Sequence, residues 1–307
     1  MSRERDQISL RLVLAVMFCV LAAGWFWMVN PPTDDSPVAV RVKSAGKPPS
    51  TINLSVSDSE STKYASISGR IVFTGEAFPL PLLVRKGDQT AKDWKVCACE
   101  DVPDERLVID PDSGGVRDVF VYLGRGRKRM VSAVHPSIIA TPPPVTLLAK
   151  HCRFHPHAFV VRTNQTIQFL NSDGLGHNLH VIPVINHPPI VAPPGSDNTS
   201  FAFRDSEPVP IEIACDFHSW MMSYVLPLDH PYAAVTGTDG SFRIDKVPAG
   251  KTKLYVWHEK RYLFRSELTV PESGFRFGDL KVEFIDGHLE LTEPASAKLS
   301  DVLASAE

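Results

Sequence analysis

The octapeptide CDFHSWMM at positions 215–222 places a thiol, an imidazole and two thioethers in one short stretch. All of these groups are soft or borderline metal ligands. A second imidazole, that of His177, follows the strand-like run TIQFLN (166–171) earlier in the chain. A histidine after one strand, with cysteine, histidine and methionine from a later loop, forms the His2Cys set with a weak thioether that is typical of blue-copper centres. The sequence therefore predicts one copper ion held by His177, Cys215, His218 and a methionine.

Each of these residues, taken alone, has a simpler explanation. Cys215 also suits a small buried apolar residue or half of a disulfide, and Met221 and Met222 suit gap-filling core residues. His177 and His218 also suit ordinary core or surface histidines. Their joint order and spacing favour the metal site, because a loop between two strands can hold one fixed geometry for both redox states of an ion.

A second cluster of chemistry-bearing residues lies in the run HCRFHPH. Side chains alternate along a strand, so Cys152 and His155 point to opposite faces, whereas His155 and His157 share a face. This spacing favours a disulfide between Cys152 and either Cys97 or Cys99 over a second metal site. The sequence leaves both of these cysteine partners open. His157 is expected behind the copper loop as a supporting residue.

The elements that must position these residues are short strands. The chain is rich in proline, and its apolar runs alternate with polar residues and end in glycine turns, which favours a sandwich or barrel over helical bundles. Strand-like runs fall at 66–75, 116–124, 144–174, 209–218, 222–229, 233–259 and 275–285. The same pattern predicts no long amphipathic helix in this part of the chain. The expected fold class is all-β.

The N-terminal segment has the features of a membrane anchor. Arginines precede an uncharged apolar run at 12–29, which is close to the roughly 20 residues that span a bilayer. We expect residues 1–30 to form one uncleaved transmembrane helix, with a cleaved signal peptide as the alternative. Residues 31–64 are rich in Pro, Ser, Thr, Asp and Lys and are expected to form a flexible linker. The rest of the chain is then exported.

Composition excludes some classes of function. The 307 residues are 43% hydrophobic and 22% charged, with a net charge of −3. This balance is typical of globular domains and gives no basic footprint for nucleic acid. The basic run RGRKR at 125–129 is expected in a solvated loop. The sequence also lacks the G-x-S-x-G, H-E-x-x-H and P-loop motifs, so no enzymatic activity is expected.

Four spaced motifs give the chain a resemblance to the cupredoxins, the plastocyanin and azurin superfamily. The resemblance is greatest to exported bacterial cupredoxin-like proteins of the methylamine-utilisation type, and it covers residues 65–260. The matching positions are Cys152, Phe154, Pro156 and His157; Asn171, Asp173, His177 and Asn178; Cys215, Asp216, His218, Trp220 and Met221; and His230, Pro231, Tyr232, Val235 and Thr236.

This resemblance implies a cupredoxin-like Greek-key β-sandwich over 65–229 that binds one copper ion. The implied ligands are His177, Cys215, His218 and an axial Met221, with Met222 as the alternative because the spacing from histidine to methionine varies among cupredoxins.

The resemblance also bears on two neighbouring features. It favours Cys97 as the disulfide partner of Cys152. Ser219 replaces the proline that follows the ligand histidine in the subgroup, a change expected to alter loop stiffness more than ligation. In the electron-transfer interpretation, the ring of Trp220, beside the loop, is expected to exclude water.

The C-terminal part is expected to form a second, smaller β-sandwich. Residues 230–288, with VTGTDGSFRIDKVPAG, resemble carboxypeptidase regulatory-like domains, in which glycines serve the turns. SGRIVFTG at 68–75 has a similar character, but it also suits the first strand of the copper domain. Residues 289–307 are expected to form a polar tail.

Together these features predict transfer of single electrons between redox partner proteins of the cell envelope. The resemblance places the protein in the bacterial inner membrane with its domains in the periplasm, or secreted if the signal is cleaved. Two alternatives remain. A copper carrier or sensor would use the same ligands with an exchangeable ion, and a non-metal adhesion or scaffold protein would have Cys215 oxidised.

Overall fold

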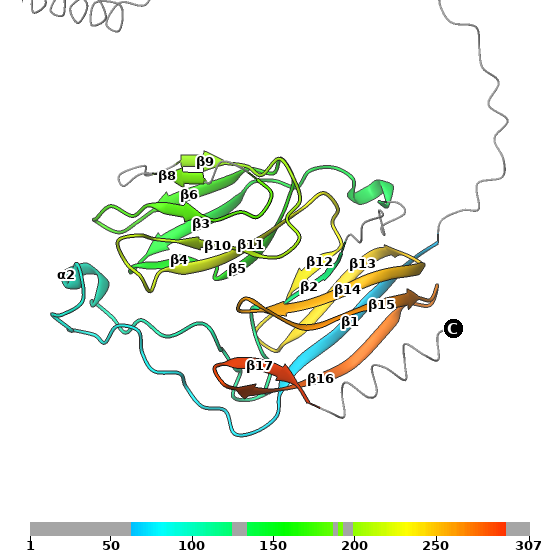
Figure 1. Ribbon diagram of the computed structural model, residues 1–307, viewed down its shortest axis with the longest axis horizontal. Helices are drawn as coiled ribbons and strands as arrows, with labels where there is room; N and C mark the ends of the chain where they lie inside the picture. Colours follow the sequence, from blue (N-terminus) through cyan, green and yellow to red (C-terminus); the bar gives the residue numbers. More distant parts are fainter. Residues whose placement is uncertain (1–62, 125–133, 187–189, 193–198, 293–307) are drawn as a thin grey trace, which may run out of the picture. The chain divides into compact units, whose positions relative to one another are not determined.

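The computed structural model describes residues 63–124, 134–186, 190–192 and 199–292 (Figure 1). All of them belong to one compact unit, Asp58–Glu307. The expected anchor (1–30), all but the end of the expected linker (31–64) and the basic run lie outside the described residues. Within the described part of the chain, no helix is both long and apolar enough to cross a bilayer.

The first sandwich consists of two sheets whose strands all lie between Val145 and Leu228. The sheets have the strand orders β5-β11-β10-β7-β8 and β4-β3-β6-β9. The strands are β3 (Val145–Lys150), β4 (Arg153–His155), β5 (Ala158–Arg162), β6 (Ile167–Asn171), β7 (Leu179–Val181), β8 (Ile190–Ala192), β9 (Thr199–Phe201), β10 (Ile211–Ala214) and β11 (Met222–Leu228). Alternate side chains of both sheets, such as Leu147, Phe169 and Ile213, are fully buried in a shared core.

The second sandwich has the sheet orders β13-β1-β16-β17 and β12-β2-β14-β15. Its strands are β1 (Tyr64–Phe73), β2 (Phe120–Leu123), β12 (Ala233–Val235), β13 (Ser241–Pro248), β14 (Gly250–His258), β15 (Arg261–Val270), β16 (Phe275–Ile285) and β17 (His288–Leu291). Its core is separate and includes Ile71, Val121, Val256 and Leu280. The expected all-β class with two sandwiches is therefore confirmed for the described residues.

The position of the first two strands differs from the predicted division at 65–229 and 230–288. β1 pairs antiparallel with β13 and parallel with β16, and β2 lies between β12 and β14. Both strands thus complete the second sandwich, which also extends through β17. Alternation identifies a strand and its buried face, but the partner of a strand depends on packing with segments far away in the chain.

Between β1 and β2 the chain leaves the second sandwich and reaches the first. The cap segment, residues 83–104, contains the single helical turn α2 (Trp94–Cys97) and closes on itself through the bridge Val84↔Val102. A disulfide from Cys97 to Cys152 fastens it to the β3–β4 turn. A further short helix, η1 (Pro136–Ile138), precedes β3.

A third apolar cluster contains residues of both sandwiches. Tyr224 of β11 packs edge-on against Trp257 of β14, with ring centroids 5.2 Å apart, and Trp257 packs in turn against Phe120 of β2 at 5.5 Å. All three rings are buried. The two sandwiches therefore share a hydrophobic interface.

Candidate metal centre

Strand pairing brings together the segments that carry the predicted ligands. β7 and β10 are antiparallel, with His180 opposite Ala214. The residues just before β7, including His177, consequently lie beside the residues just after β10, including Cys215. β10 and β11 form a hairpin with Ala214 opposite Met222, so the loop that carries the remaining ligands is anchored at both ends.

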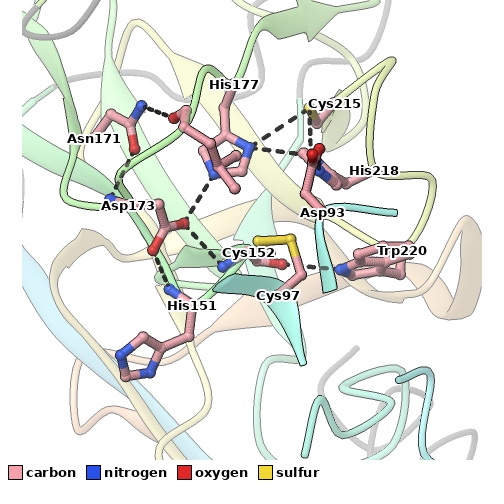
Figure 2. The surroundings of a disulfide bond; sticks show 11 residues. Asp93, Cys97, His151, Cys152, Asn171, Asp173, His177, Cys215, His218 and Trp220 are labelled. Carbon is pink, nitrogen blue, oxygen red and sulfur yellow. Dashed lines mark hydrogen bonds and ion pairs between the residues drawn. A yellow bond between two sulfur atoms is a disulfide. The ribbon is translucent and has the colours of Figure 1, made fainter. Parts of the chain in front are cut away.

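The three predicted donor side chains converge in the interior (Figure 2). Cys215 Sγ lies 3.9 Å from His177 Nδ1 and 3.7 Å from His218 Nδ1, and the two Nδ1 atoms are 3.2 Å apart. The exposed fractions are 3% for Cys215, 1% for His177 and 0% for His218. A single ion among these atoms would be within reach of all three.

The two methionines lie in different surroundings. Met221 is 1% exposed and packs in the same core cluster as Cys215. Met222 packs instead in the interface cluster, and its sulfur accepts a hydrogen bond from the Tyr224 hydroxyl at 3.1 Å. Because adjacent residues entering a strand point to opposite faces, only one of the two thioethers can face the donor group, and these contacts favour Met221.

The outer nitrogen of His177 is held by a carboxylate. Nε2 lies 2.8 Å from Asp173 Oδ2. Asp173 also accepts hydrogen bonds from the backbone N–H groups of His151 (2.6 Å) and Cys152 (2.9 Å), and those two residues have positive φ angles of 51° and 53°. The β3–β4 turn therefore fixes the carboxylate that orients the ring, as is usual for histidine ligands of metals.

The outer nitrogen of His218 is held in the same way by the cap segment. Nε2 lies 3.0 Å from Asp93 Oδ2 (Figure 2). Asp93 is at the N-cap position of α2 with φ 52°, yet its side chain makes no capping hydrogen bond. A non-glycine residue in the left-handed region is strained, and here the conformation accompanies a carboxylate directed at a ring nitrogen of the site.

Trp220 covers the other side of His218. The two rings are 5.3 Å apart, and Trp220 Nε1 donates to the carbonyl of Cys152 at 3.1 Å. Together with the Cys97–Cys152 disulfide, which resemblance had suggested, this contact ties the loop after β10 to the β3–β4 turn. Cys99 is free and exposed.

The pKa values of two donor groups, Cys215 and His177, are shifted strongly from their ordinary values. Burial raises the pKa of the Cys215 thiol, but hydrogen bonds from His177, His218 and the backbone N–H groups of Asn178 and Phe217 outweigh this and lower the pKa to about 5. Burial likewise lowers the pKa of His177, but Asp173 and Cys215 raise it to about 9. At neutral pH and without a metal, the pair is a thiolate beside an imidazolium.

A side-chain clamp joins the two ligand-bearing segments. Asn178 Nδ2 donates to Asp216 Oδ2 at 2.6 Å, and Asn178 Oδ1 accepts from the backbone N–H of Asp216 at 2.8 Å. His180 pairs with the other carboxylate oxygen of Asp216 at 2.8 Å. These contacts lock residues next to His177 against residues next to Cys215.

His157 is not among the converging ligands. Its Nε2 lies 2.9 Å from Glu259 of the second sandwich. Burial lowers the pKa of His157, but Glu259, together with Asp118 and Glu105, outweighs burial and raises it. The ring lines a cavity of about 220 Å³ that Trp220, Met221 and Met222 also line, and its expected role as a support for the copper loop stays a prediction.

The sequence did not assign roles to Asp93 and Asp173. Asp173 is one of the positions that match the cupredoxin-like motif, four residues before His177. That spacing could have indicated its contact with the His177 ring. Asp93 lies in a polar segment with no recognisable pattern, and nothing in the sequence marks it as a neighbour of His218. Asp93 reaches His218 because the disulfide brings the cap segment to the site.

The donor set fits copper. Two imidazole nitrogens and one thiolate, with a thioether in the same core, form a soft and borderline set with a sulfur of high negative charge. Each imidazole has its outer nitrogen bonded to a carboxylate, which leaves Nδ1 to face the thiolate. The three donor side chains are at most 3% exposed, so the residues suit an ion held entirely by protein.

Comparison with known proteins finds similar chains among solved structures. No protein-family model matches the chain, and no curated protein matches it. Similar solved structures include a Cu-containing nitrite reductase (NirK) from Thermus scotoductus SA-01, at 21% identity over 29% of this chain and 23% of that chain, with a TM-score of 0.25. This chain thus spans less than a quarter of the length of the nitrite reductase.

Two smaller proteins are also similar. An amicyanin variant in its reduced Cu(I) form shares 15% identity over 29% of this chain and 85% of its own, with a TM-score of 0.25. A purple cupredoxin from Nitrosopumilus maritimus shares 19% identity over 27% and 98%, with a TM-score of 0.22. Each overlap covers less than a third of this chain, so the function is argued from the geometry of the site.

Proposed function

We propose that this protein is a mononuclear blue-copper protein that transfers single electrons. The observation that carries the proposal is the convergence of Cys215 Sγ, His177 Nδ1 and His218 Nδ1 within 3.2–3.9 Å of one another in a buried site. Copper bound there would supply a one-electron couple. Met221 would be its axial ligand, and Met222 would stay with Tyr224.

The residues of the site favour electron transfer over other copper chemistry. Asp173 and Asp93 fix the two rings from outside, and the β10–β11 hairpin fixes the thiolate, so little reorganisation accompanies a change of charge. The three donor side chains are at most 3% exposed. We therefore include in the proposal that no substrate is bound at the ion and that the protein is not an enzyme.

Location and partners belong to the same proposal. The apolar run at 12–29 supports an inner-membrane anchor, with secretion after cleavage as the alternative, and residues 31–64 would link it to the domains. The Cys97–Cys152 disulfide supports export, because disulfides persist in oxidising compartments such as the periplasm. Redox proteins of the envelope would be the partners, and the second sandwich, which resembles carboxypeptidase regulatory-like domains, would be a spacer.

The test is the visible spectrum of the full-length chain with copper(II). We expect one ion per chain and an intense thiolate-to-copper charge-transfer band that Cys215→Ser removes. Met221→Leu should shift the band and raise the reduction potential, because an axial donor is lost and the site becomes more apolar. Met222→Leu, the matched control, should leave both unchanged. A wild-type spectrum without that band would contradict the proposal.

Two further measurements separate the alternatives. An electron-transfer protein should exchange electrons rapidly and lose copper slowly to a chelator, whereas a carrier or sensor should lose the ion rapidly. Thiol counting under denaturing conditions tests the scaffold alternative, since that alternative requires an oxidised Cys215. The described structure has Cys215 free and buried.

A further inference from the structure

We propose that reduction of the Cys97–Cys152 disulfide creates a second metal site, in which the two thiolates and His218 bind a copper(I) ion. The proposal rests on the proposed copper function only through His218, which both sites would contact. It gives the disulfide a role beyond stability.

The geometry of three overlapping groups supports this site. Among the described residues, the ligand atoms of Cys97, Cys152 and His218 all lie within 4.8 Å of one another, as do those of His177, Cys215 and His218. A third such group combines Cys152 with His177 and Asp173. The disulfide sulfurs therefore adjoin the proposed copper ligands (Figure 2).

The burial of the new donor set suits a soft cation. Cys97, Cys152 and His218 are each 0% exposed. A disulfide sulfur is a poor ligand, whereas a thiolate is the form of cysteine that binds metals. Thiolates are soft ligands that suit copper(I), as they also suit zinc and iron–sulfur clusters. A buried pair of thiolates would also be costly without a cation, because an uncompensated buried charge is strongly unfavourable.

The chemistry balances with a dithiol as the reductant. The dithiol passes two electrons and two protons to Cys97 and Cys152 and becomes a disulfide itself, and the bond between the two protein sulfurs breaks. Copper(I) then displaces both thiol protons to solvent and forms two bonds to sulfur and one to a nitrogen of His218. The copper remains in the +1 state throughout.

The cap segment offers a route for the reductant. It contains one helical turn, one β-bridge and a small apolar cluster of Val84, Ala98 and Val102, and its Cys97 packs in the core of the first sandwich. Local opening of such a segment costs less free energy than global unfolding.

The experiment is a copper(I) titration against a chromophoric chelator in the full chain carrying Cys19→Ser, Cys99→Ser and Cys215→Ser. Cys215→Ser removes the thiolate of the first site, so success or failure here is independent of the charge-transfer band that tests the proposed function. We expect one more copper(I) ion per chain after treatment with a dithiol than in the oxidised chain, in which only His177, His218 and Met221 remain to bind it. His218→Gln should weaken the binding in the reduced chain.

Three results would overturn the proposal. One is a reduced chain that binds no more copper(I) than the oxidised chain. Another is a disulfide that stays intact in the dithiol while the chain is folded. The third is dithiol-dependent binding that survives Cys97→Ser with Cys152→Ser. If that double variant does not fold, alkylation followed by mass spectrometry replaces it. Copper(I) should then protect Cys97 and Cys152 of the reduced chain, and equal alkylation with and without copper(I) contradicts the site.

Discussion

Two carboxylates, Asp93 and Asp173, set the direction of the two imidazoles at the site. Each accepts from the outer ring nitrogen, at 3.0 Å and 2.8 Å respectively, and so leaves the inner nitrogen for an ion. Asp173 is fixed by backbone N–H groups of the β3–β4 turn, whereas Asp93 is 45% exposed and depends on the cap segment. The His218 side is therefore the more easily disturbed.

Replacing Asp93 by Asn should lower copper affinity by about 10- to 100-fold, the usual cost of losing a partner that orients a histidine ligand. Asp101→Asn is the matched control. Asp101 lies in the same cap segment and accepts the Lys86 backbone N–H at 2.7 Å, a bond that Asn retains. Competition with a chelator measures both variants, and equal affinities for the two would show that Asp93 does not act through His218.

The acidity of Cys215 predicts a pH dependence that needs no metal. Its pKa of about 5 lies below the ordinary value of 9.0, so the thiolate persists at neutral pH and is lost as the pH falls through about 5. The stabilising contribution of this thiolate to folding changes in the same direction with pH. It is fully present above pH 9 and is lost as the pH falls to about 5. Thiolate absorbance in the ultraviolet, taken as wild type minus Cys215→Ser, measures the titration.

The same titration has a variant that tests its cause. His177→Gln removes a charged hydrogen-bond donor to the sulfur, so the thiol should then titrate at a higher pH. A midpoint near the ordinary thiol value in the wild type, or an unchanged midpoint in His177→Gln, would contradict this explanation. At this scale the types and order of residues in the sequence named the three side chains that converge, His177, Cys215 and His218. The sequence was insufficient for Asp93, whose contact depends on a distant disulfide.

The register of β7, β10 and β11 is the element-scale cause of the site. A shift of one residue would turn the side chains of a strand to its other face, and would separate His177 from Cys215. The buried residues Ile213 and Val181, which are paired across β10 and β7, oppose such a shift. The sequence predicted β10 and β11 because their alternation is clear, but it marked no strand at β7, and the hydrogen-bonded neighbours of all three strands came only from the structure.

A glycine shows how the second sandwich depends on β1. Gly240, in the turn before β13, has φ +74°, and a Cβ there would lie 2.1 Å from the carbonyl of Ile71 in β1. Gly240→Ala should therefore destabilise the protein by about 1–3 kcal/mol or more, from backbone strain and a clash. Gly237→Ala is the control, since its Cβ would meet only Asp239 Oδ1 at 3.5 Å.

Thermal or denaturant unfolding measures both glycine variants. Equal stabilities would mean that β1 does not close against this turn. The TDG turn itself was predicted from the sequence, because glycine is the residue that adopts positive φ without cost. The approach of β1 was not predicted, because SGRIVFTG also suits the first strand of the copper domain, to which the sequence assigned it.

At the scale of the whole molecule, the interface of Tyr224, Trp257 and Phe120 joins the two sandwiches. His157 and Glu259 add a buried polar contact across the same boundary. Because Tyr224 lies on the strand that follows the ligand loop, stability of the second sandwich should support the copper site.

Trp257→Ala should cost about 3–5 kcal/mol, as is usual for removing a large buried aromatic side chain. In the wild type, tryptophan fluorescence and copper absorbance should be lost in one coincident transition, and the variant should lower both midpoints together. Separate transitions in the wild type, or a variant that leaves the copper midpoint unchanged, would show two independent sandwiches.

The proposed copper centre depends most on which atoms of the protein would bind the metal. X-ray absorption of the copper-loaded full-length chain measures that directly. We expect one short bond to sulfur and two to imidazole nitrogen, with the sulfur bond absent in Cys215→Ser and one imidazole absent in His177→Gln. A spectrum of nitrogen and oxygen ligands alone, unchanged in both variants, would contradict the proposed centre.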